Sequence, residues 1–529
     1  TKMGLVLEIQ IKKEEEFQYD DSSIYRYNRG FLISKDLAFI EERNLSFAEI
    51  AGFTDGHSVF SDLQVYSIYP KEELRKNLIA KLRSGEQFFE GIHGFEHTVI
   101  PDLERAILSR HNIILLGLRG QAKTRIARLL TSLLDEYIPV VAGSDLNDDP
   151  FNPLSFYAKN LLQEKGDDTP ITWLHRDMRY TEKLATPDVS IADLIGDVDP
   201  IKAANLKLNY NDERVIHFGL IPRSHRCIFV INELPDLQAR IQVALFNILQ
   251  EGDIQIRGFK IRLPLDIQFV FTANPEDYTN RGSIVTPLKD RIESQILTHY
   301  PKDVAISKII THQEANINAE QSARVQLNEL AKDMIEQIAF EARKSEYVDQ
   351  KSGVSARMTI TALENLVSGA ERRSIKSRDE KTFIRVSDFW SVIPSITGKI
   401  ELVYEGEQEG PYIVAINLIG KAVRAQFTQY FPAPEKAKKP VGKKGEQPDA
   451  KRNNLYQEII DWFNEGNTVD LLNESSNAEY RKSLENVPGL KKLVQKLHPK
   501  ISADEQYFLM EFVLHGLAEY SLLSKHLLQ

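Results

Sequence analysis

The segment GLRGQAKT, residues 117–124, carries the residue types that bind phosphate groups. The general phosphate-loop pattern is G-x-x-x-x-G-K-S/T, and it follows a strand and opens a helix. Gly117, Lys123 and Thr124 match three of the four fixed positions, and Ala122 stands at the second glycine position. In such a loop, backbone N–H groups and a helix N-terminus surround the anion. The lysine contacts the β- and γ-phosphates, and the hydroxyl binds Mg²⁺.

This pattern predicts nucleotide binding. The residues predicted to surround the phosphates are Gly117, Leu118, Arg119, Gly120, Gln121, Ala122, Lys123 and Thr124. The alternative is an ordinary strand, turn and helix with a stray lysine. Ala122 favours that alternative, because alanine adopts unusual backbone angles less readily than glycine.

A polar pair ends a later apolar run. RCIFVINELPDL places Asn232 and Glu233 directly after a strand-like stretch. In nucleotide hydrolases this position usually reads Asp-Glu, where the first acid holds the Mg²⁺ shell and the second polarises the attacking water. Asn232 is neutral and is therefore a weaker metal partner, whereas Glu233 remains available as the base. The alternative is a buried strand that ends in a helix cap, at Asn232 or Asp236.

Three further residues are candidates because of where they stand along the chain. Asn274 ends the run IQFVFTAN, where an amide at a strand tip can position the lytic water. TPLKDRIESQ places Arg291 at a helix start after a proline turn, and GVSARMTITALENL places Arg357 at the start of a later helix. Lone arginines are usually solvated surface residues, so their order after the other motifs carries this prediction.

The elements that position these residues follow from apolar runs. Strand-like runs precede Gly117 and cover residues 138–143, 227–231 and 267–274, with helical segments between them. That alternation is typical of a parallel α/β sheet. Residues 252–266 alternate on both sides of Arg257-Gly258-Phe259 and predict a β-hairpin. In the N-terminal segment, residues 4–11 and 29–33 predict a pair of strands.

Taken in order, these motifs resemble those of the AAA+ ATPases, most clearly the MoxR branch and the ATPase (I) subunit of magnesium chelatase. The MoxR-type loop typically reads G-x-P-G-x-A-K-S/T, which accounts for Ala122, whereas Arg119 replaces its proline. INELPDLQARIQVALFNILQEGDIQIRG is similar to the family's acidic strand end, helix and hairpin. The resemblance covers about residues 70–400, and residues 1–66 fall outside it.

The resemblance implies an α/β fold: an AAA+ P-loop NTPase core with a parallel sheet, flanking helices and β-hairpin inserts, followed by an α-helical lid and a C-terminal helical domain. It implies ATP and Mg²⁺ as cofactors, with ATP bound between the subunits of a homo-oligomeric ring, a hexamer in the family. Hydrolysis would remodel or metal-load a partner protein, as a chaperone does. A von Willebrand A-domain protein is the partner that the family suggests.

The resemblance also implies a role for each candidate residue. Lys123 and Thr124 hold phosphate and Mg²⁺, and Asn232 and Glu233 complete the metal and water site. Asn274 senses the γ-phosphate. Arg291 is the finger that reaches the neighbouring subunit's ATP, and Arg357 is the lid sensor. Ile92 and Gly94 of FEGIHGFEH lie near the adenine.

The sequence predicts five regions. They are an accessory N-terminal segment (1–66), an α/β nucleotide-binding domain (67–300), an α-helical lid (301–431), a basic Pro/Lys-rich linker (432–454) and a C-terminal helical domain (455–529). The linker carries few large apolar side chains, so it cannot build a core.

Composition restricts the setting of the chain. A net charge of −10 argues against a surface that binds nucleic acid all over. The single cysteine, Cys227, excludes an internal disulfide and is predicted to be packed. No apolar run is long enough for a membrane helix, and the first residues lack the features of a signal peptide. We therefore expect a cytoplasmic protein without a membrane span.

Two alternative functions remain open at this stage. A nucleotide switch or scaffold that hydrolyses poorly is motivated by Asn232. A nucleic-acid motor is motivated by the hairpin inserts, which replicative helicases share, although the acidic net charge and the absence of a recognisable DNA-binding module make it the weaker alternative. His93 and His97 do not form the zinc-protease pattern, because Gly94 follows the first histidine. No residue indicates a tetrapyrrole site.

Overall fold

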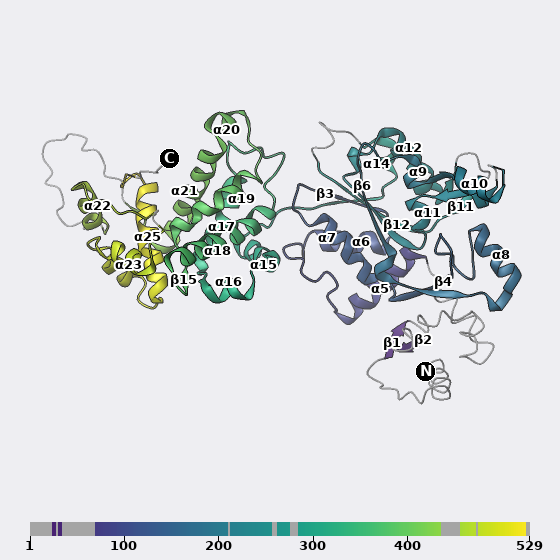
Figure 1. The fold of residues 1–529 in the computed structure, drawn as a ribbon, viewed down its shortest axis with the longest axis horizontal. Coiled ribbons are helices and arrows are strands. Elements are labelled where there is room, and N and C mark those ends of the chain that lie inside the picture. The colour runs from purple at the N-terminus through teal and green to yellow at the C-terminus, as the bar shows by residue number, and fades with distance from the viewer. Residues whose placement is uncertain are drawn as a thin grey trace. The chain divides into compact units, whose positions relative to one another are not determined.

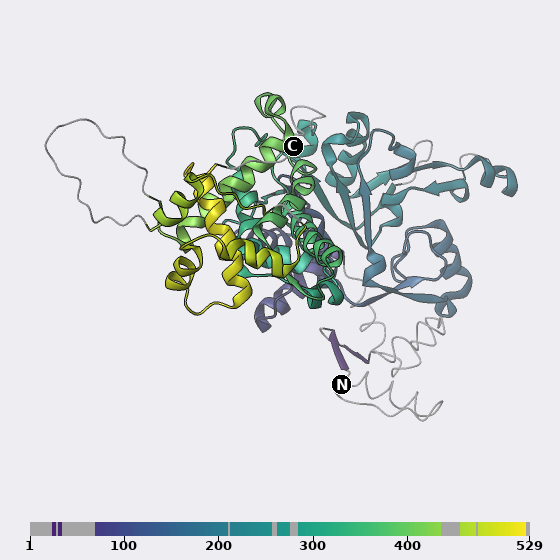
Figure 2. The same cartoon turned by 60° about the vertical axis from the view of Figure 1, so that its left-hand side comes forward.

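A computed structural model describes residues 24–27, 30–33, 69–209, 212–256, 262–275, 284–434, 455–471 and 474–524 (Figures 1 and 2). Its contacts divide the chain into two compact units. The first holds the chain up to Gly117 together with Ala122–His299, and the second holds Leu118–Gln121 together with Tyr300–Gln529. None of the helices in the described ranges combines the length and apolarity that a membrane span requires.

The first unit is built on a sheet of five strands, in the order β13-β3-β12-β9-β6. All four neighbouring pairs are parallel. The strands are β3 (Ile113–Leu116), β6 (Tyr180–Leu184), β9 (Cys227–Asn232), β12 (Ile267–Ala273) and β13 (Ser294–Leu297). Since the carboxyl ends of parallel strands lie at the same edge, the residues that follow β3, β9 and β12 come close together there.

Helices cover both faces of this sheet, because alternate residues of each strand point to opposite sides. On one face, Ile113, Val230 and Val270 belong to a core that also contains residues of α5, α6 and α7. On the other face, Phe229 and Phe271 belong to a core with residues of α12 and α14 (Figure 1). The helices are α5 (Pro70–Ser84), α6 (Val99–Leu108), α7 (Lys123–Leu129), α12 (Ala239–Glu251) and α14 (Thr286–Asp290).

The prediction that residues 138–143 join the parallel sheet is wrong. Residues 138–141 lie in β4 (Tyr137–Val141), which pairs antiparallel with β5 (Ile171–His175) in a separate two-stranded sheet. The position beside β9 is taken by β6, whose sequence YTEKL is mostly polar and whose residues are mostly half-buried. A strand at a sheet edge is less enclosed than a central parallel strand, so it does not need a continuous apolar run. Because β6 is polar, it has no apolar run from which a strand could have been predicted.

Short inserts extend the first unit. β7 (Gly196–Val198) pairs antiparallel with β8 (Ile216–Phe218). The predicted hairpin at 252–266 is confirmed by the antiparallel pairing of β10 (Asp253–Gln255) with β11 (Arg262–Pro264), whereas residues 257–261 lie outside the described ranges. The other inserted helices are α8 (Phe156–Lys165), α9 (Ile191–Leu194), α10 (Pro200–Leu206) and α11 (Leu220–Arg223).

In the N-terminal segment, the strand expected at 29–33 is present as β2 (Gly30–Ile33). Its partner is β1 (Ile24–Tyr27), in an antiparallel pair. The partner strand predicted at residues 4–11 lies outside the described residues.

The amino-terminal edge of the parallel sheet carries a buried ion network. Arg179, which precedes β6, donates to both carboxylate oxygens of Glu73 on α5 over 2.7 and 2.6 Å. Its Nε also donates to the carbonyl of Arg226, directly before β9, over 3.0 Å. The backbone N–H of Asp135 donates to Glu73 over 2.6 Å. All four residues are buried, and burial, assisted by the Glu73 charge, raises the pKa of Asp135 to about 6.

The second unit is helical, with a short parallel pair of strands. Its elements are α15 (Val304–Glu314), α16 (Ala319–Arg324), β14 (Val325–Gln326), α17 (Glu329–Ala342), α18 (Arg357–Ser377), β15 (Thr382–Phe383), η8 (Val386–Val392), α19 (Ile393–Thr397), α20 (Tyr404–Glu409), α21 (Pro411–Tyr430), α22 (Gln457–Asn464), α23 (Asn477–Glu485), α24 (Leu490–Leu497) and α25 (Ala503–Glu519).

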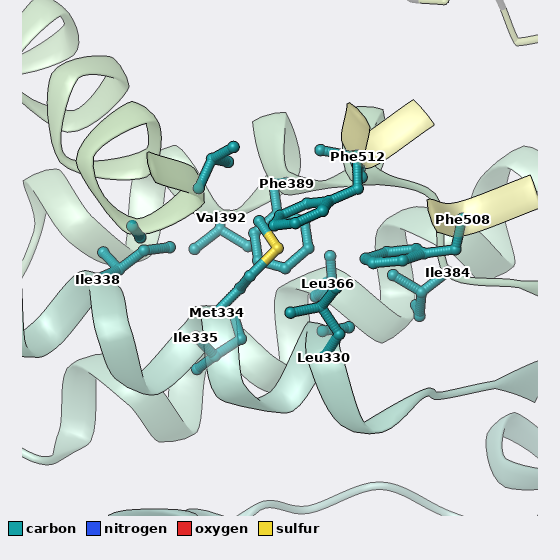
Figure 3. Close-up of a cluster of buried hydrophobic side chains, with 14 of the residues drawn as sticks. Leu330, Met334, Ile335, Ile338, Leu366, Ile384, Phe389, Val392, Phe508 and Phe512 are labelled. Atoms are coloured by element: carbon teal, nitrogen blue, oxygen red, sulfur yellow. The ribbon is translucent and has the colours of Figure 1, made fainter. Parts of the chain in front are cut away.

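One hydrophobic core joins helices from both sides of the predicted linker. Met334 of α17, Leu366 of α18 and Phe389 of η8 belong to the same buried cluster as Phe508 and Phe512 of α25 (Figure 3). Residues 435–454 of the predicted linker lie outside the described residues. The fold class that the sequence predicts is confirmed: a parallel α/β sheet with flanking helices and hairpin inserts is followed by a helical region.

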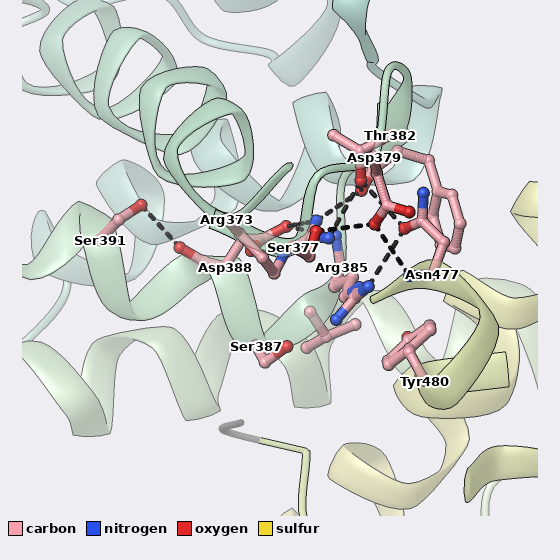
Figure 4. A network of polar contacts seen from close by, with 12 residues as sticks. Arg373, Ser377, Asp379, Thr382, Arg385, Ser387, Asp388, Ser391, Asn477 and Tyr480 are labelled. Atoms are coloured by element: carbon pink, nitrogen blue, oxygen red, sulfur yellow. Dashed lines mark hydrogen bonds and ion pairs between the residues drawn. The ribbon is translucent and has the colours of Figure 1, made fainter. Parts of the chain in front are cut away.

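A polar network fastens this helical unit. Arg373 of α18 donates to both carboxylate oxygens of Asp388 over 2.9 Å each, and Asp388 also accepts from the backbone N–H of Arg385 over 2.8 Å (Figure 4). The Arg385 guanidinium lies 4.0 Å from the ring centroid of Tyr480, whose hydroxyl donates to buried Glu511 over 2.6 Å. Together these contacts join α18 and η8 to α23 and α25.

Candidate functional site

Three of the predicted residues form one hydrogen-bonded chain at the carboxyl edge of the sheet. Lys123 Nζ donates to Asn274 Oδ1 over 2.8 Å and also to the carbonyl of Gly117. Asn274 Nδ2 donates to Glu233 Oε2 over 3.1 Å. Gly117, just after β3, donates its backbone N–H to the carbonyl of Ala273, at the end of β12, over 3.2 Å. The parallel pairing of β3, β12 and β9 thus brings residues from distant parts of the chain together.

Among the described residues at this edge, two that are not glycine have a left-handed backbone. Ala122, directly before α7, has a φ of 57°, and Glu233, directly after β9, also has a φ of 57°. A side chain in this region costs roughly 1–2 kcal/mol. Such conformations cluster at functional sites, where the surrounding structure holds them. Ala122 therefore adopts the backbone conformation for which the general pattern uses glycine. An ordinary strand–turn–helix does not require that conformation.

Asn232 does not act as a helix cap, so that alternative is wrong for this residue. Its Oδ1 accepts from Thr272 Oγ1 over 3.1 Å, and its Nδ2 donates to Glu182 Oε1 over 2.5 Å. Thr272 Oγ1 also accepts from the backbone N–H of Glu233 over 3.1 Å. Through Thr272, Asn232 and Glu233 become part of one network that spans the ends of β6, β9 and β12.

Glu182, like Thr272, is a polar residue of this network that sequence reasoning missed. It lies on β6, and its Oε2 accepts from Arg128 of α7 over 2.9 and 3.2 Å and from the Tyr180 hydroxyl over 3.1 Å. Burial and the Glu182 charge raise the pKa of Tyr180, and the hydrogen bond with Glu182 raises that of Arg128. No signal in YTEKL could have found it, because three consecutive polar residues give neither an apolar run nor an alternation.

The donors at this edge fit a hard divalent cation only together with phosphate oxygens. Within the residues that the structure describes, no group of three or more His, Cys, Asp or Glu side chains is positioned to hold a metal ion by itself. Mg²⁺ is usually held by one or two carboxylates, waters and substrate phosphates, and prefers oxygen ligands. The Thr124 hydroxyl, in the first turn of α7, and the Asn232 amide oxygen are donors of that kind.

Arg291 lies at a helix end rather than at the helix start that the sequence predicts. It follows α14 (Thr286–Asp290), whose proline stands in the first turn, so the proline opens the helix and the arginine ends it. Its guanidinium donates to Gln250 Oε1 over 3.0 and 2.7 Å and to the Pro287 carbonyl over 2.7 Å. It also lies 5.1 Å from the ring centroid of Phe246. These contacts hold it against α12 of its own chain.

The tip of the phosphate loop, Leu118–Gln121, groups with the second unit. Arg119 forms an ion pair with Glu401, and its carbonyl accepts from the Tyr300 hydroxyl over 2.8 Å. Gly120 has a φ of 73°, and a Cβ there would lie 2.2 Å from Ser355 Oγ. Close approach and positive φ both require glycine at this position.

Arg357 and the pair Ile92 and Gly94 have defined places. Arg357 is the first residue of α18 in the second unit, so the predicted helix start is confirmed. Ile92 is buried in the core that contains α5, α6 and α7. Gly94 has a φ of 83° and donates its backbone N–H to Glu96 over 3.0 Å. Cys227 is buried at the start of β9, as predicted. The functional roles of Arg357, Ile92 and Gly94 stay predictions.

No protein-family model matches the chain. Among solved structures it is similar to NtrX from Brucella abortus, with 13% identity over 55% of this chain and 54% of that chain, at a TM-score of 0.32. It is also similar to the complex between subunits BchI and BchD of magnesium chelatase, with 19% identity, coverage of 61% and 98%, and a TM-score of 0.33. For a RuvB mutant from Thermotoga maritima these values are 12%, 66% and 81%, and 0.32. The chain spans about half the length of NtrX. These likenesses are distant.

Proposed function

We propose that this chain is an AAA+ ATPase of the MoxR or magnesium-chelatase-I type, which binds ATP with Mg²⁺ and hydrolyses it. The observation that carries this proposal is the hydrogen-bonded chain Lys123–Asn274–Glu233. It combines a cation at the phosphate-loop pattern with a carboxylate and an amide at the neighbouring strand ends. That is the set of groups that phosphate binding and water activation require.

Each side chain of this set has a proposed task. Lys123 exchanges its contacts with Asn274 and Gly117 for phosphate oxygens when a nucleotide enters. Glu233 orients the attacking water and accepts its proton, and the Asn274 amide, which already donates to Glu233, orients the carboxylate. Thr124 and Asn232 would hold Mg²⁺, which supplies charge neutralisation at the phosphates when it is bound.

Ring assembly and partner remodelling belong to the same proposal. Arg291 acts on the nucleotide of a neighbouring subunit, in a hexameric ring, and Arg357 acts as the lid sensor. The energy of hydrolysis remodels or metal-loads a partner protein with a von Willebrand A domain. Light scattering with ATP and Mg²⁺ checks the ring, and a protein that stays monomeric at micromolar concentration counts against it.

A nucleotide switch that hydrolyses poorly is the second candidate, and Asn232 is the observation that favours it. An amide lacks the charge that an aspartate would bring to the Mg²⁺ shell. Both candidates require nucleotide binding, so the first experiment addresses binding alone.

Calorimetry with ATP and Mg²⁺ on Lys123→Ala tests the site. A hydrogen bond to a charged group is worth about 1.5–3 kcal/mol, so we expect the affinity to fall roughly 10- to 100-fold. Lys159→Ala is the matched control, because this lysine is exposed on α8 in the same unit, and it should keep wild-type affinity. Equal affinity in wild type and Lys123→Ala would refute the proposed phosphate site.

A further inference from the structure

Asn232 is neutral at a position where an acid is expected, and the neighbouring strand β6 carries the carboxylate of Glu182 beside it. We propose that Glu182 supplies, through the amide of Asn232, the negative charge and the orientation that an aspartate at position 232 would give to a divalent cation bound with nucleotide. Glu182 is then a positioning residue. This inference rests on the proposed function, because it concerns the same nucleotide site.

The sheet register brings the two side chains together. β6 and β9 are parallel, with Glu182 opposite Val230 and Leu184 opposite Asn232. Val230 and Asn232 point to the same face of the sheet, because they are two residues apart. Glu182 Oε1 consequently accepts from Asn232 Nδ2 over 2.5 Å, although the two residues are far apart in the sequence.

Both ends of the Asn232 amide are held. Glu182 accepts from its nitrogen, and Thr272 Oγ1 donates to its oxygen over 3.1 Å. An amide oxygen has two acceptor sites, so one remains for the water shell of a cation. A carboxylate that accepts from the N–H₂ group also polarises the amide and makes its oxygen a stronger acceptor. The amide thus transmits part of the carboxylate's charge.

The same carboxylate is tied to the helix that opens with the phosphate-loop lysine and threonine. Arg128 of α7 donates to Glu182 Oε2, which leaves Oε1 for Asn232. Thr124 and Arg128 are four residues apart on α7, so they share one face of that helix. The Glu182 side chain is 24% exposed, so its charge is only partly screened by solvent.

A purely structural role is the competing explanation, in which Glu182 only joins β6 to α7. The two explanations differ in what matters, the charge at this position or the contact with Arg128. Moving the carboxylate to position 232 keeps the charge at the site and loses the contact. Removing the arginine loses the contact and keeps the charge.

The experiment is calorimetry of ADP binding in Mg²⁺ and in EDTA, with the ratio of the two affinities as the readout and thermal melting as the check on folding. Electron paramagnetic resonance of Mn²⁺ in the presence of ADP measures the binding of the divalent cation directly. We expect Glu182→Gln to lower the ratio roughly fivefold or more, which corresponds to about 1 kcal/mol, and to leave the EDTA affinity unchanged. Glu182→Gln with Asn232→Asp should restore the ratio, and Arg128→Ala should keep it.

The outcomes separate this inference from the proposed function. If wild type shows the Mg²⁺ effect and Glu182→Gln shows the same ratio, Glu182 has no such role and the nucleotide site stands. If the double variant does not recover, or Arg128→Ala loses as much as Glu182→Gln, the contact matters and the inference is overturned. If Glu182→Gln melts at the temperature of its purification, Arg128→Ala and the double variant are compared with wild type: wild-type ratios in both support the inference, and a fivefold loss in either overturns it. Wild type that binds ADP in neither buffer overturns both proposals.

Discussion

The two edges of the parallel sheet both carry polar networks, but the networks differ in kind. At the amino edge, Glu73 and Arg179 are 2% and 0% exposed and are satisfied by each other and by nearby backbone. At the carboxyl edge, Lys123, Glu233 and Asn274 are only partly buried, and Glu233 has a left-handed backbone. The network at the amino edge is buried and stabilises the fold, whereas the charged groups at the carboxyl edge are accessible to solvent.

This difference indicates how one sheet separates stability from chemistry. A buried ion pair tolerates no loss of a partner, because the remaining charge has no water to solvate it. A half-exposed network can exchange partners, since solvent or a phosphate group replaces a lost hydrogen bond. We therefore expect substitutions at the amino edge to change stability and substitutions at the carboxyl edge to change nucleotide chemistry.

The largest effect is expected for Glu73→Ala. It leaves the Arg179 guanidinium buried without its carboxylate, which costs about 3–5 kcal/mol of stability. Urea denaturation followed by circular dichroism measures the loss, and ADP affinity of the folded protein should not change. Glu72→Ala is the control, since Glu72 is partly exposed and pairs at the surface with Arg75 and Arg110. An equal loss for both variants would remove the distinction between the two edges.

Glu233→Gln should have the opposite signature. Loss of the proposed base lowers turnover by about 10²- to 10⁴-fold, with little change in nucleotide affinity or in the urea midpoint. Steady-state ATP hydrolysis and calorimetry measure the two quantities. Glu251→Gln, at the exposed end of α12, is the control with unchanged turnover. A wild type that binds ATP and does not hydrolyse it, with the ring formed, favours the nucleotide switch instead.

Much of the carboxyl edge was predictable from sequence, because its residues stand directly after apolar runs. Gly117, Glu233 and Asn274 follow β3, β9 and β12, and each of these strands is buried throughout. A buried parallel strand has a continuous apolar sequence, so its end is easy to locate. Parallel strands then bring their ends together, whatever their separation along the chain.

The rest depended on pairings that the sequence does not reveal. Glu182 lies within the polar strand β6, which pairs with β9 across a long sequence separation. Residues 138–143 are apolar, yet they pair outside the main sheet. Glu73 and Arg179 meet only because α5 packs at the amino edge. Tertiary packing decides these positions. A local sequence pattern does not show which distant residues will pack together.

The smallest effect is a pH dependence at the amino edge. The pKa of Asp135 is raised from 3.8 to about 6, mainly by burial and also by the charge of Glu73. Between these pH values the folded protein holds a proton that the unfolded chain has released. Asp135 therefore contributes stability below about pH 4, and this contribution is lost as the pH rises to about 6.

Asp135→Asn should remove this pH dependence. Its amide oxygen can still accept from Asn77 Nδ2, which donates to Asp135 over 2.8 Å. Wild type and variant should have similar stability near pH 4, and above pH 6 the variant should be more stable by at most about 3 kcal/mol. Urea midpoints measured from pH 4 to 7.5 give the comparison. A difference that does not change with pH would mean that Asp135 ionises in the folded protein as it does in the unfolded chain, and that the amino edge is more open to water than its burial indicates.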